Sequence, residues 1–391
     1  MDKIIPLHII GGLGDVTIGR KLKFLLLNPD VSKHLGLISI LDRYSDVKRI
    51  HSEPRDFLEK DVKPNFKTVV QEEVLDALAN RIKSGGIRYY CSERGGTGIE
   101  DFFRGTKRGD VIDISTPNLS HISYLERAAN ETQANITVEK PVVANASDII
   151  VARNIVLAAK RIDPKRIFVD QEHYSHYELI MKYIDHLSQN VANFGKIKEI
   201  KIEIREQEGF ESQRNKNVIN RDISGGGIWL DLGPHVMSFL TSLGSIINRG
   251  SIRAERYKSS DPNILGEEYK ETRMDVSLEA NSPYFLRSGA KVDISVGKAA
   301  DTTRKVFEIK HENGWAKIDI GNKTYTDSLG MTEKLNAQEP FLNSYIDLIG
   351  AVKDRKQPRT PIEKSLETLT NLFEIQTIAD SGPMINYHNW K

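Results

Sequence analysis

The sequence predicts an α/β protein in which an N-terminal doubly wound parallel sheet is followed by an α+β domain with a mainly antiparallel sheet. Short apolar runs recur up to residue 170 and alternate with helix-like segments, a pattern typical of parallel strands that are buried on both faces. Beyond about residue 195, apolar and polar residues alternate instead, as in strands with one solvent-exposed face. The length of 391 residues exceeds one ordinary core and favours two domains.

The elements of the first domain follow from these runs in chain order. We expect strands over 4–10, 37–41, 87–91, 110–115, 135–139 and 166–170, with helices over 19–27, 71–82, 119–130 and 146–160. In the second domain we expect strands within 196–206 and 305–320, a hairpin turn at Asn313-Gly314, and a C-terminal helix over 365–379. We divide the chain into a first domain over 1–142 and a second over 143–391.

Composition excludes several classes of partner. The 55 basic and 54 acidic side chains leave a net charge of +1, which provides no field for nucleic acid or an anionic membrane, so a small molecule is the expected partner. The single cysteine, Cys91, forms no internal disulfide, and we interpret it as a buried strand residue. No signal peptide and no apolar stretch of membrane-spanning length is evident, so we expect a cytoplasmic protein.

A glycine-rich turn follows the first expected strand and precedes the first helix. Gly11, Gly12 and Gly14 in this turn would present backbone N–H groups and a helix N-terminus to a pyrophosphate, which predicts a Rossmann domain that binds NAD or NADP. The strict G-x-G-x-x-G pattern fails because position 17 is Thr, so a merely tight loop is the alternative.

An acidic and a basic residue follow the second expected strand. Asp42 would accept hydrogen bonds from the ribose hydroxyls of NAD, whereas Arg43 would favour the 2′-phosphate of NADP. The pair therefore points to both cofactors, and an ordinary exposed pair in a loop is the alternative.

Several motifs of the first domain resemble those of glucose-6-phosphate dehydrogenase and of the glucose-fructose oxidoreductase and inositol dehydrogenase family. GGLGDVTIGRKL is similar to the glucose-6-phosphate dehydrogenase turn, with one extra residue near Gly19, and DVIDISTPNLSH and NITVEKPVV resemble segments of the inositol dehydrogenase type. The resemblance implies cofactor contacts, with Lys140 also reaching into the active site. The implied contact residues are Asp15, Thr116, Pro117, Asn118, His121, Glu139 and Lys140.

Motifs of the second domain extend the resemblance. EHYSHYE is similar to the D-H-Y-L-G-K-E segment of glucose-6-phosphate dehydrogenases, GGGIWLDLGPH to the inositol dehydrogenase pattern, and residues 340–361 to the closing helix and loop of the family. Glu172 replaces the leading aspartate, and Tyr177 replaces the lysine that grips the substrate phosphate. The resemblance therefore implies the chemistry more strongly than it implies a 6-phosphate on the substrate.

Oxidation of an alcohol by NAD(P) needs a base and a group that stabilises charge on oxygen. His235 is the expected base because imidazole accepts a proton near neutral pH. Asp231 lies four residues earlier, on the same face of a helix, where it could orient His235 or contact the substrate, and Pro234 fits only within the first helical turn. Lys140 is expected to stabilise the reacting oxygen. An exposed helix pair and a lysine that enters solvent are the alternatives.

Glu172, His173, Tyr174 and Tyr177 follow the strand expected at 166–170, at the edge where open α/β sheets bind ligands. We expect them to contact sugar hydroxyls or a phosphate, and a packed aromatic cluster is the alternative. Asp170 and Glu172 compete as the carboxylate partner of His235. His173 and His176 could ligate a metal ion, but no third ligand is evident in the sequence, so no metal is expected.

Together these features predict an NAD(P)-dependent oxidoreductase that transfers a hydride between nicotinamide and a sugar, polyol or sugar phosphate. A glucose-6-phosphate dehydrogenase proper is one alternative. A non-catalytic protein that senses nicotinamide is an alternative of another class. An open-faced sheet in the second domain could pair subunits, so we expect a homo-oligomer, a dimer or a tetramer.

Overall fold

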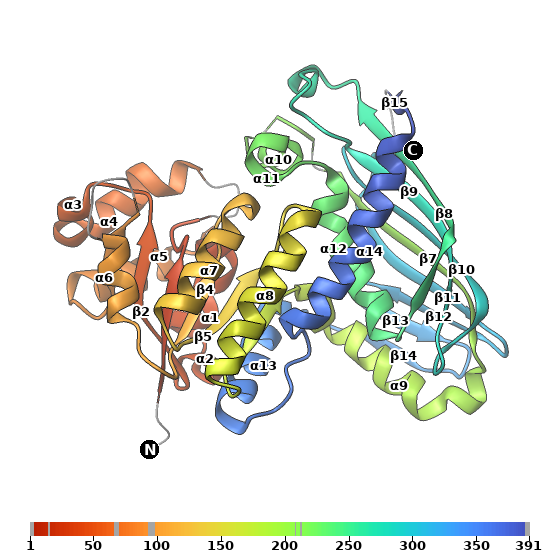
Figure 1. Cartoon of the computed structure of the whole chain (residues 1–391), viewed down its shortest axis with the longest axis horizontal. Coiled ribbons are helices and arrows are strands. Elements are labelled where there is room, and N and C mark those ends of the chain that lie inside the picture. The colour runs from red at the N-terminus through yellow and green to blue at the C-terminus, as the bar shows by residue number, and fades with distance from the viewer. Residues whose placement is uncertain are drawn as a thin grey trace. The chain divides into compact units, whose positions relative to one another are not determined.

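A computed structural model of the chain describes residues 4–14, 16–65, 70–92, 98–207, 209–211 and 213–387 (Figure 1). The contacts between residues divide the chain into two compact units. Unit 1 consists of residues 1–143, 150–171 and 341–363, and unit 2 of residues 144–149, 172–340 and 364–391. Across the described ranges, no helix combines the length and apolar character needed to cross a bilayer.

Unit 1 is built on a parallel sheet whose strand order is β3-β2-β1-β4-β5-β6. This order is that of the Rossmann fold, in which the direction of winding reverses between β1 and β4. The six strands fall within one or two residues of the ranges predicted from the apolar runs, so the predicted parallel sheet is confirmed. The strands are β1 (Ile5–Ile10), β2 (Leu35–Asp42), β3 (Arg88–Cys91), β4 (Val111–Ile114), β5 (Asn135–Glu139) and β6 (Phe168–Gln171).

Helices cover this sheet, and their apolar faces pack on its central strands, which are buried on both faces. The longer helices are α1 (Leu22–Leu27), α5 (Glu72–Lys83), α6 (Gly98–Gly105), α7 (His121–Glu131), α8 (Ala146–Ile162) and α13 (Pro340–Asp354). The shorter segments are η1 (Thr17–Lys21), α2 (Pro29–Ser32), α3 (Val47–Ser52), α4 (Pro54–Phe57), η2 (Leu58–Val62), η3 (Lys63–Asn65) and η4 (Asn118–Ser120).

Cys91 lies in β3, as predicted, but it is partly exposed rather than buried. The reason is that β3 is an edge strand of the sheet, with a neighbour on one side only. The interpretation of Cys91 as a buried residue was therefore wrong.

Unit 2 contains a nine-stranded sheet of order β14-β13-β12-β11-β7-β10-β9-β8-β15. All neighbouring pairs are antiparallel except β7–β10 and β8–β15, which confirms the mainly antiparallel sheet and the hairpin at Asn313-Gly314 between β11 and β12. The strands are β7 (Ile197–Glu206), β8 (Ile246–Ser259), β9 (Arg273–Asn281), β10 (Leu286–Lys298), β11 (Arg304–His311), β12 (Trp315–Asp319), β13 (Thr324–Asp327), β14 (Thr332–Lys334) and β15 (Met384–Tyr387).

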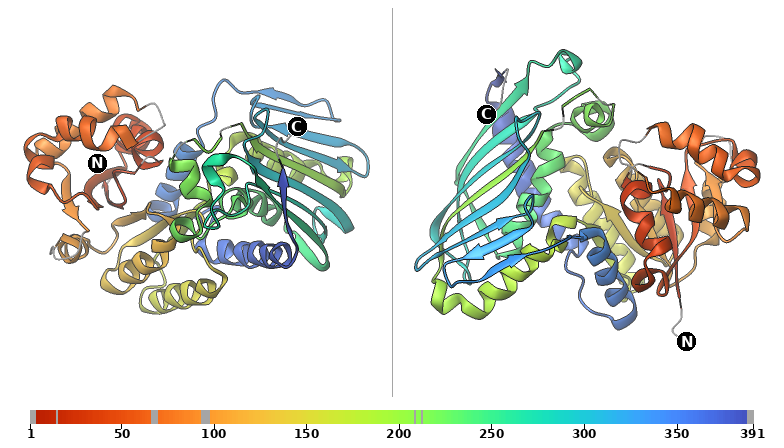
Figure 2. Two further views of the ribbon diagram at one scale, coloured as in Figure 1. Left: turned by 90° about the horizontal axis from the view of Figure 1, so that it is seen from above. Right: turned by 180° about the vertical axis from the view of Figure 1, so that it is seen from behind.

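Helices of unit 2 lie along one face of this sheet, and the other face carries no helix in the part of the unit that the structure describes (Figure 2). Phe239 of α12 packs on Phe307 of β11, so the covered face is the apolar one. The helices are η5 (His173–His176), α9 (Glu178–Phe194), α10 (Gln213–Ile219), α11 (Arg221–Ser224), α12 (Ile228–Ser242), η6 (Pro262–Ile264) and α14 (Ile362–Ser381).

Helix α12 begins at Ile228, directly after three glycines with positive φ. Gly227 has φ +86°, a conformation that L side chains rarely adopt, and a Cβ atom there would lie 2.1 Å from a carboxylate oxygen of Glu271, so glycine is favoured at this position. Pro234 is the seventh residue of this helix and lies beyond its first turn, contrary to the sequence-based expectation. The helix continues through it, at the cost of the hydrogen bond that residue 234 would donate to Leu230.

Candidate functional site

The glycine turn of unit 1 leads from β1 into a π-helical turn, η1. Gly11 has φ +81°, and a Cβ atom there would lie 2.5 Å from the Ser115 carbonyl oxygen, so close contact with the neighbouring strand end requires glycine. Thr17, which replaces the last glycine of the strict pattern, is buried and donates a hydrogen bond from its hydroxyl to the Gly11 carbonyl at 3.1 Å. Asp15 lies outside the described residues. Gly12 and Gly14 lie in the turn as predicted.

Asp42 ends β2 beside this turn. Its carboxylate accepts hydrogen bonds from the backbone N–H groups of Leu13, at 2.8 Å, and Arg43, at 2.7 Å. Burial raises its pKa, an effect that these hydrogen bonds and the Arg43 charge only partly offset. Asp42 thus ties the glycine turn to the second strand, while the Arg43 guanidinium lies 5.7 Å from the centre of the Tyr44 ring.

A second turn follows β4 and contains Thr116, Pro117 and Asn118. His121 begins α7, as expected, and is fully buried. Its Nδ1 lies 2.8 Å from the Pro141 carbonyl oxygen and its Nε2 lies 2.7 Å from that of Thr116. His121 therefore fastens this turn to the segment that follows β5.

Glu139 and Lys140 lie at the end of β5, and beneath them is a buried polar network that the sequence reasoning missed. Lys21 is completely buried, and its Nζ lies 3.2 Å from Asp113, 3.1 Å from Glu139 and 2.6 Å from the Ser115 hydroxyl. It also donates to Gln171, and Tyr345 donates to Asp113. Burial lowers the pKa of Lys21, but the charges of Asp113 and Glu139 outweigh burial and hold the pKa above its usual value.

The predicted catalytic histidine of unit 2 is paired with a carboxylate. Nδ1 of His235, on α12, forms a short hydrogen bond with Glu172 Oε1, and both side chains are almost completely buried. The other contacts of Glu172 are the backbone N–H groups of Tyr174 and Ser175. Burial would raise the pKa of Glu172, but His235 and these N–H groups hold it below its usual value. Of the two carboxylates left open by the sequence, Glu172 is the partner.

Tyr174 stacks on His235, with ring centres 4.0 Å apart and planes inclined by 13°. His173 packs against the edge of His235 at 4.6 Å, and Tyr177 lies 4.9 Å from the Tyr174 ring. The structure therefore brings together His235 and all four predicted substrate residues, Glu172, His173, Tyr174 and Tyr177.

Three of these residues have the chemistry of metal ligands. The ligand atoms of Glu172, His173 and His235 all lie within 4.8 Å of one another. His176, the other histidine that the sequence offers as a ligand, instead directs Nδ1 to the Glu172 carbonyl at 3.2 Å. Within this cluster, Glu172 and His235 form a hydrogen bond with each other.

Asp231 lies one turn before His235 on α12, but its charged neighbour is a lysine. Its carboxylate is 4.0 Å from Lys298 Nζ, and Lys298 also pairs with Glu206. Sequence reasoning missed Lys298 and Glu206. A signal was available, because each is the charged last residue of an otherwise apolar series, Ile200, Ile202 and Ile204 in β7 and Val292, Ile294 and Val296 in β10.

Solved structures of several oxidoreductases share the fold of this chain. The 3-ketoreductase KijD10 from Actinomadura kijaniata, in complex with NADP and TDP-benzene, is similar with a TM-score of 0.68 and 14% identity over 98% of this chain and 100% of that one. The WlbA dehydrogenase from Chromobacterium violaceum, in complex with NADH and UDP-GlcNAcA, is similar with a TM-score of 0.69 and 15% identity over 97% of this chain and 95% of that one.

An aldose-aldose oxidoreductase from Caulobacter crescentus, complexed with glycerol, gives a TM-score of 0.68 and 17% identity over 97% of this chain and 99% of that one. No family model and no curated protein sequence matches the chain. At these identities the comparisons establish the fold, and they agree with the fold that the motifs implied.

Proposed function

We propose that the chain is an NAD(P)-dependent oxidoreductase that transfers a hydride between nicotinamide and a sugar, polyol or sugar phosphate. The observation that carries this proposal is the buried Glu172–His235 pair, which follows a Rossmann unit in the same chain. Structures of the same fold hold NADP or NADH together with a nucleotide-linked ligand. The chemistry of a carboxylate-oriented imidazole suits the removal of a proton from a hydroxyl group.

The cofactor is proposed to bind to unit 1. The glycine turn lies at the carboxyl end of β1, where the strand order reverses, the position at which open α/β sheets bind nucleotides. Gly11, Gly12 and Gly14 would approach the pyrophosphate, with Asp42 or Arg43 at the ribose. The residues around Thr116, Pro117, Asn118, His121, Glu139 and Lys140 would line the nicotinamide end. When bound, the cofactor supplies the hydride acceptor or donor.

The residues of the chain would handle the proton. Because Nδ1 of His235 is occupied by Glu172, Nε2 is the nitrogen that takes the hydroxyl proton during oxidation and returns it during reduction. Lys140 would stabilise the negative charge that develops on the reacting oxygen. Asp231 would accept a hydrogen bond from a second substrate hydroxyl. Unit 2, with Glu172, His173, Tyr174 and Tyr177, would hold the substrate.

The direct test is the change in nicotinamide absorbance with NAD or NADP and a panel of hexoses, inositols and their phosphates. We expect turnover with at least one member, and a loss of about 100-fold or more in kcat in His235→Asn, since general base catalysis contributes on that scale. Unchanged turnover in His235→Asn would refute the assignment of the base.

The same experiment distinguishes an oxidoreductase from the alternative, a protein that senses nicotinamide without catalysis. A sensor would bind the cofactor in a thermal-shift measurement and give no turnover with any member of the panel. A glucose-6-phosphate dehydrogenase proper would turn over glucose 6-phosphate in preference to glucose. Lys140→Ala is expected to lower kcat, and an unchanged rate would remove Lys140 from the mechanism.

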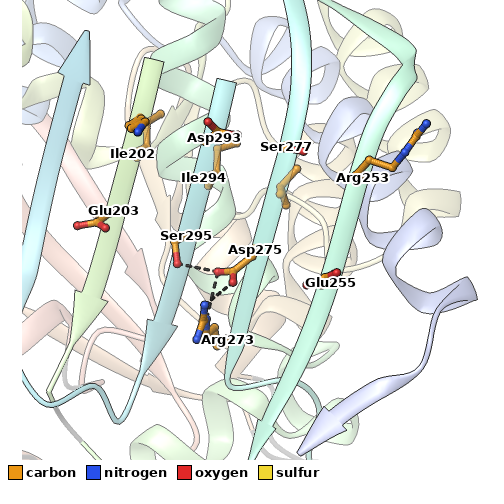
Figure 3. Close-up of a pocket in the computed structure, with 12 residues that line it drawn as sticks. Ile202, Glu203, Arg253, Glu255, Arg273, Asp275, Ser277, Asp293, Ile294 and Ser295 are labelled. Carbon is orange, nitrogen blue, oxygen red and sulfur yellow. Dashed lines mark hydrogen bonds and ion pairs between the residues drawn. The ribbon is translucent and has the colours of Figure 1, made fainter. Parts of the chain in front are cut away.

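We further propose that the bare face of the unit 2 sheet joins two copies of this chain. A hollow of about 510 Å³ lies on this face. Figure 3 shows residues that line it, among which Asp275 accepts a hydrogen bond from Ser295 and pairs with Arg273. Strand register aligns charges of one sign in neighbouring rows across the sheet. The acidic row contains Glu203, Asp275 and Glu255, and the basic row contains Arg205, Arg273 and Arg304.

A twofold axis parallel to these rows would lay the acidic row of one copy on the basic row of the other, so the face complements itself. Light scattering at micromolar concentration should give at least twice the chain mass of 44.2 kDa. Reversal of one row member, Asp275→Arg, should yield monomers, and the exchanged pair Asp275→Arg with Arg273→Asp should restore the oligomer. A monomeric wild-type protein would refute this proposal.

A further inference from the structure

A group of charged side chains lies at one end of the unit 2 sheet, on the face that the helices cover. Three strands contribute it: Glu206 ends β7, Lys298 ends β10 beside it in register, and Lys305 stands near the start of β11. Each residue shares a face with buried apolar residues of its own strand. On this face of the sheet, buried apolar side chains therefore occupy most of each strand, and charged side chains lie at one end.

Within this group the positive charges are matched. Lys298 Nζ pairs with Glu206 Oε2, Lys305 Nζ lies 2.7 Å from Glu206 Oε1, and Lys298 Nζ lies 4.0 Å from Asp231. The Lys298 and Glu206 side chains are 6% and 18% exposed, so water screens this pair only weakly. Burial would raise the pKa of Glu206, but Lys298 and Lys305 hold it at about 2, so Glu206 stays ionised.

This group lies near Tyr174, which stacks on the proposed base, because the Glu206 and Asp231 charges act on Tyr174. Burial raises the pKa of Tyr174, and the nearby Tyr177, Glu206, Glu172 and Asp231 raise it further, so the Tyr174 hydroxyl keeps its proton. That hydroxyl is buried and has no hydrogen-bond partner among the described residues, while the Tyr174 ring stacks on His235. A buried hydroxyl without a partner is costly, which favours a ligand group that bonds to it.

The balance of charge around His235 therefore decides what the unit can accept. Three carboxylates, Glu172, Glu206 and Asp231, stand against the two ammonium groups of Lys298 and Lys305. A phosphate or carboxylate in this place would meet ammonium groups that already pair with Glu206 and Asp231, and burial of an unmatched anion is unfavourable. Hydroxyl groups, in contrast, donate readily to carboxylate oxygens and to the tyrosine oxygen.

We propose that Glu206 is a specificity-determining residue: by engaging both Lys298 and Lys305, it makes this end of unit 2 select an uncharged, hydroxyl-bearing sugar or polyol portion and reject a phosphate or carboxylate. The inference rests on the proposed function, because it names the substrate class of that same site. Without the Glu206 charge, the buried Lys298 and the partly buried Lys305 would lose the carboxylate that they share, and an anion would become the favoured ligand.

The test compares the neutral and phosphorylated members of matched pairs, glucose with glucose 6-phosphate and inositol with inositol phosphate. In the wild-type protein we expect the ratio of kcat/KM to favour the neutral member by at least tenfold. In Glu206→Gln we expect this ratio to shift toward the phosphorylated member by at least tenfold. Glu72→Gln is the matched control, because Glu72 also bridges two cations, Arg55 and Lys63, on the surface of unit 1.

An equilibrium readout separates this inference from the proposed function. Calorimetric titrations measure the affinity for inorganic phosphate. Glu206→Gln should bind phosphate at least tenfold more tightly than the wild-type protein or Glu72→Gln does. This gain should disappear when Lys298→Met and Lys305→Met are added to Glu206→Gln. This gain without any nicotinamide turnover would support the inference and refute the oxidoreductase.

Several outcomes would overturn the inference. These are a wild-type preference for the phosphorylated member, an unchanged ratio in Glu206→Gln, and a gain in phosphate affinity that survives removal of both lysines. If Glu206→Gln does not fold, Lys298→Met tests the same idea in the opposite direction, because it should lower use of the phosphorylated member further. An unchanged or raised use would then contradict the proposal.

Discussion

At the scale of single residues, Glu172 decides which form of His235 is available. A carboxylate on Nδ1 favours the proton on that nitrogen, and in the proposed mechanism Nε2 exchanges the substrate proton. The same carboxylate is the N-cap of η5, because it accepts from two backbone N–H groups of that turn. One side chain therefore positions both the base and the segment that carries His173 and Tyr174.

Glu172→Gln should lower kcat by about 100-fold or more while KM changes little, because the amide no longer stabilises the imidazolium that forms in the transition state. Glu172→Asp should restore part of the rate, since it keeps the charge. Glu178→Gln, at the start of α9, is the control and should turn over at the wild-type rate. A wild-type kcat in Glu172→Gln would remove Glu172 from the mechanism.

At the scale of elements, the start of α12 rests on a buried carboxylate. Glu271 accepts from the Trp229 backbone N–H at 3.2 Å and is almost fully buried. Burial raises its pKa from 4.5 to about 7. Since the folded-state pKa lies above the unfolded one, Glu271 contributes stability that is fully present below about pH 4.5 and is lost as the pH rises toward 7.

Glu271→Gln should therefore be more stable than the wild-type protein at pH 8, by an amount on the order of 1–3 kcal/mol. The amide oxygen still accepts from Trp229 N–H but carries no charge to bury. The difference should shrink as the pH falls toward 5 in urea unfolding curves. Exposed Glu267→Gln should show no such trend, and a pH-independent difference for Glu271→Gln would contradict the explanation.

How far the sequence predicts these elements depends on what sets each one. The strands of unit 1 follow from uninterrupted apolar runs, and the position of β1, β4 and β5 fixes where Gly11, Thr116 and Glu139 lie. The extra residue noted near Gly19 becomes the π-helical turn Thr17–Lys21, since a single inserted residue widens one helical turn. Pattern reasoning could expect the insertion but not its form.

Long-range pairing lies beyond such patterns. The network around Lys21 joins residues up to 232 positions apart in sequence, and Lys298 meets Glu206 only because β10 pairs with β7 in parallel. No local period encodes which strands become neighbours. The choice of Glu172 over Asp170 likewise depended on the packing of η5 against α12, which the sequence alone left open.

At the scale of the whole molecule, cofactor binding should raise the thermal stability. At a concentration 100 times Kd, a ligand adds about 2.7 kcal/mol, which corresponds to a rise in Tm of several degrees for a protein of this size. Arg43→Ala should reduce the rise caused by NADP and leave that caused by NAD unchanged. Equal losses with both cofactors would mean that Arg43 does not contact the 2′-phosphate.

The chain passes between its two units at residues 143–144, 149–150, 171–172, 340–341 and 363–364. The last strand of the Rossmann sheet, β6, and most of α13 are encoded after the first of these passages, and Tyr345 of α13 bonds to Asp113 in unit 1. Neither unit can thus be gained, lost or exchanged by a single gene fusion.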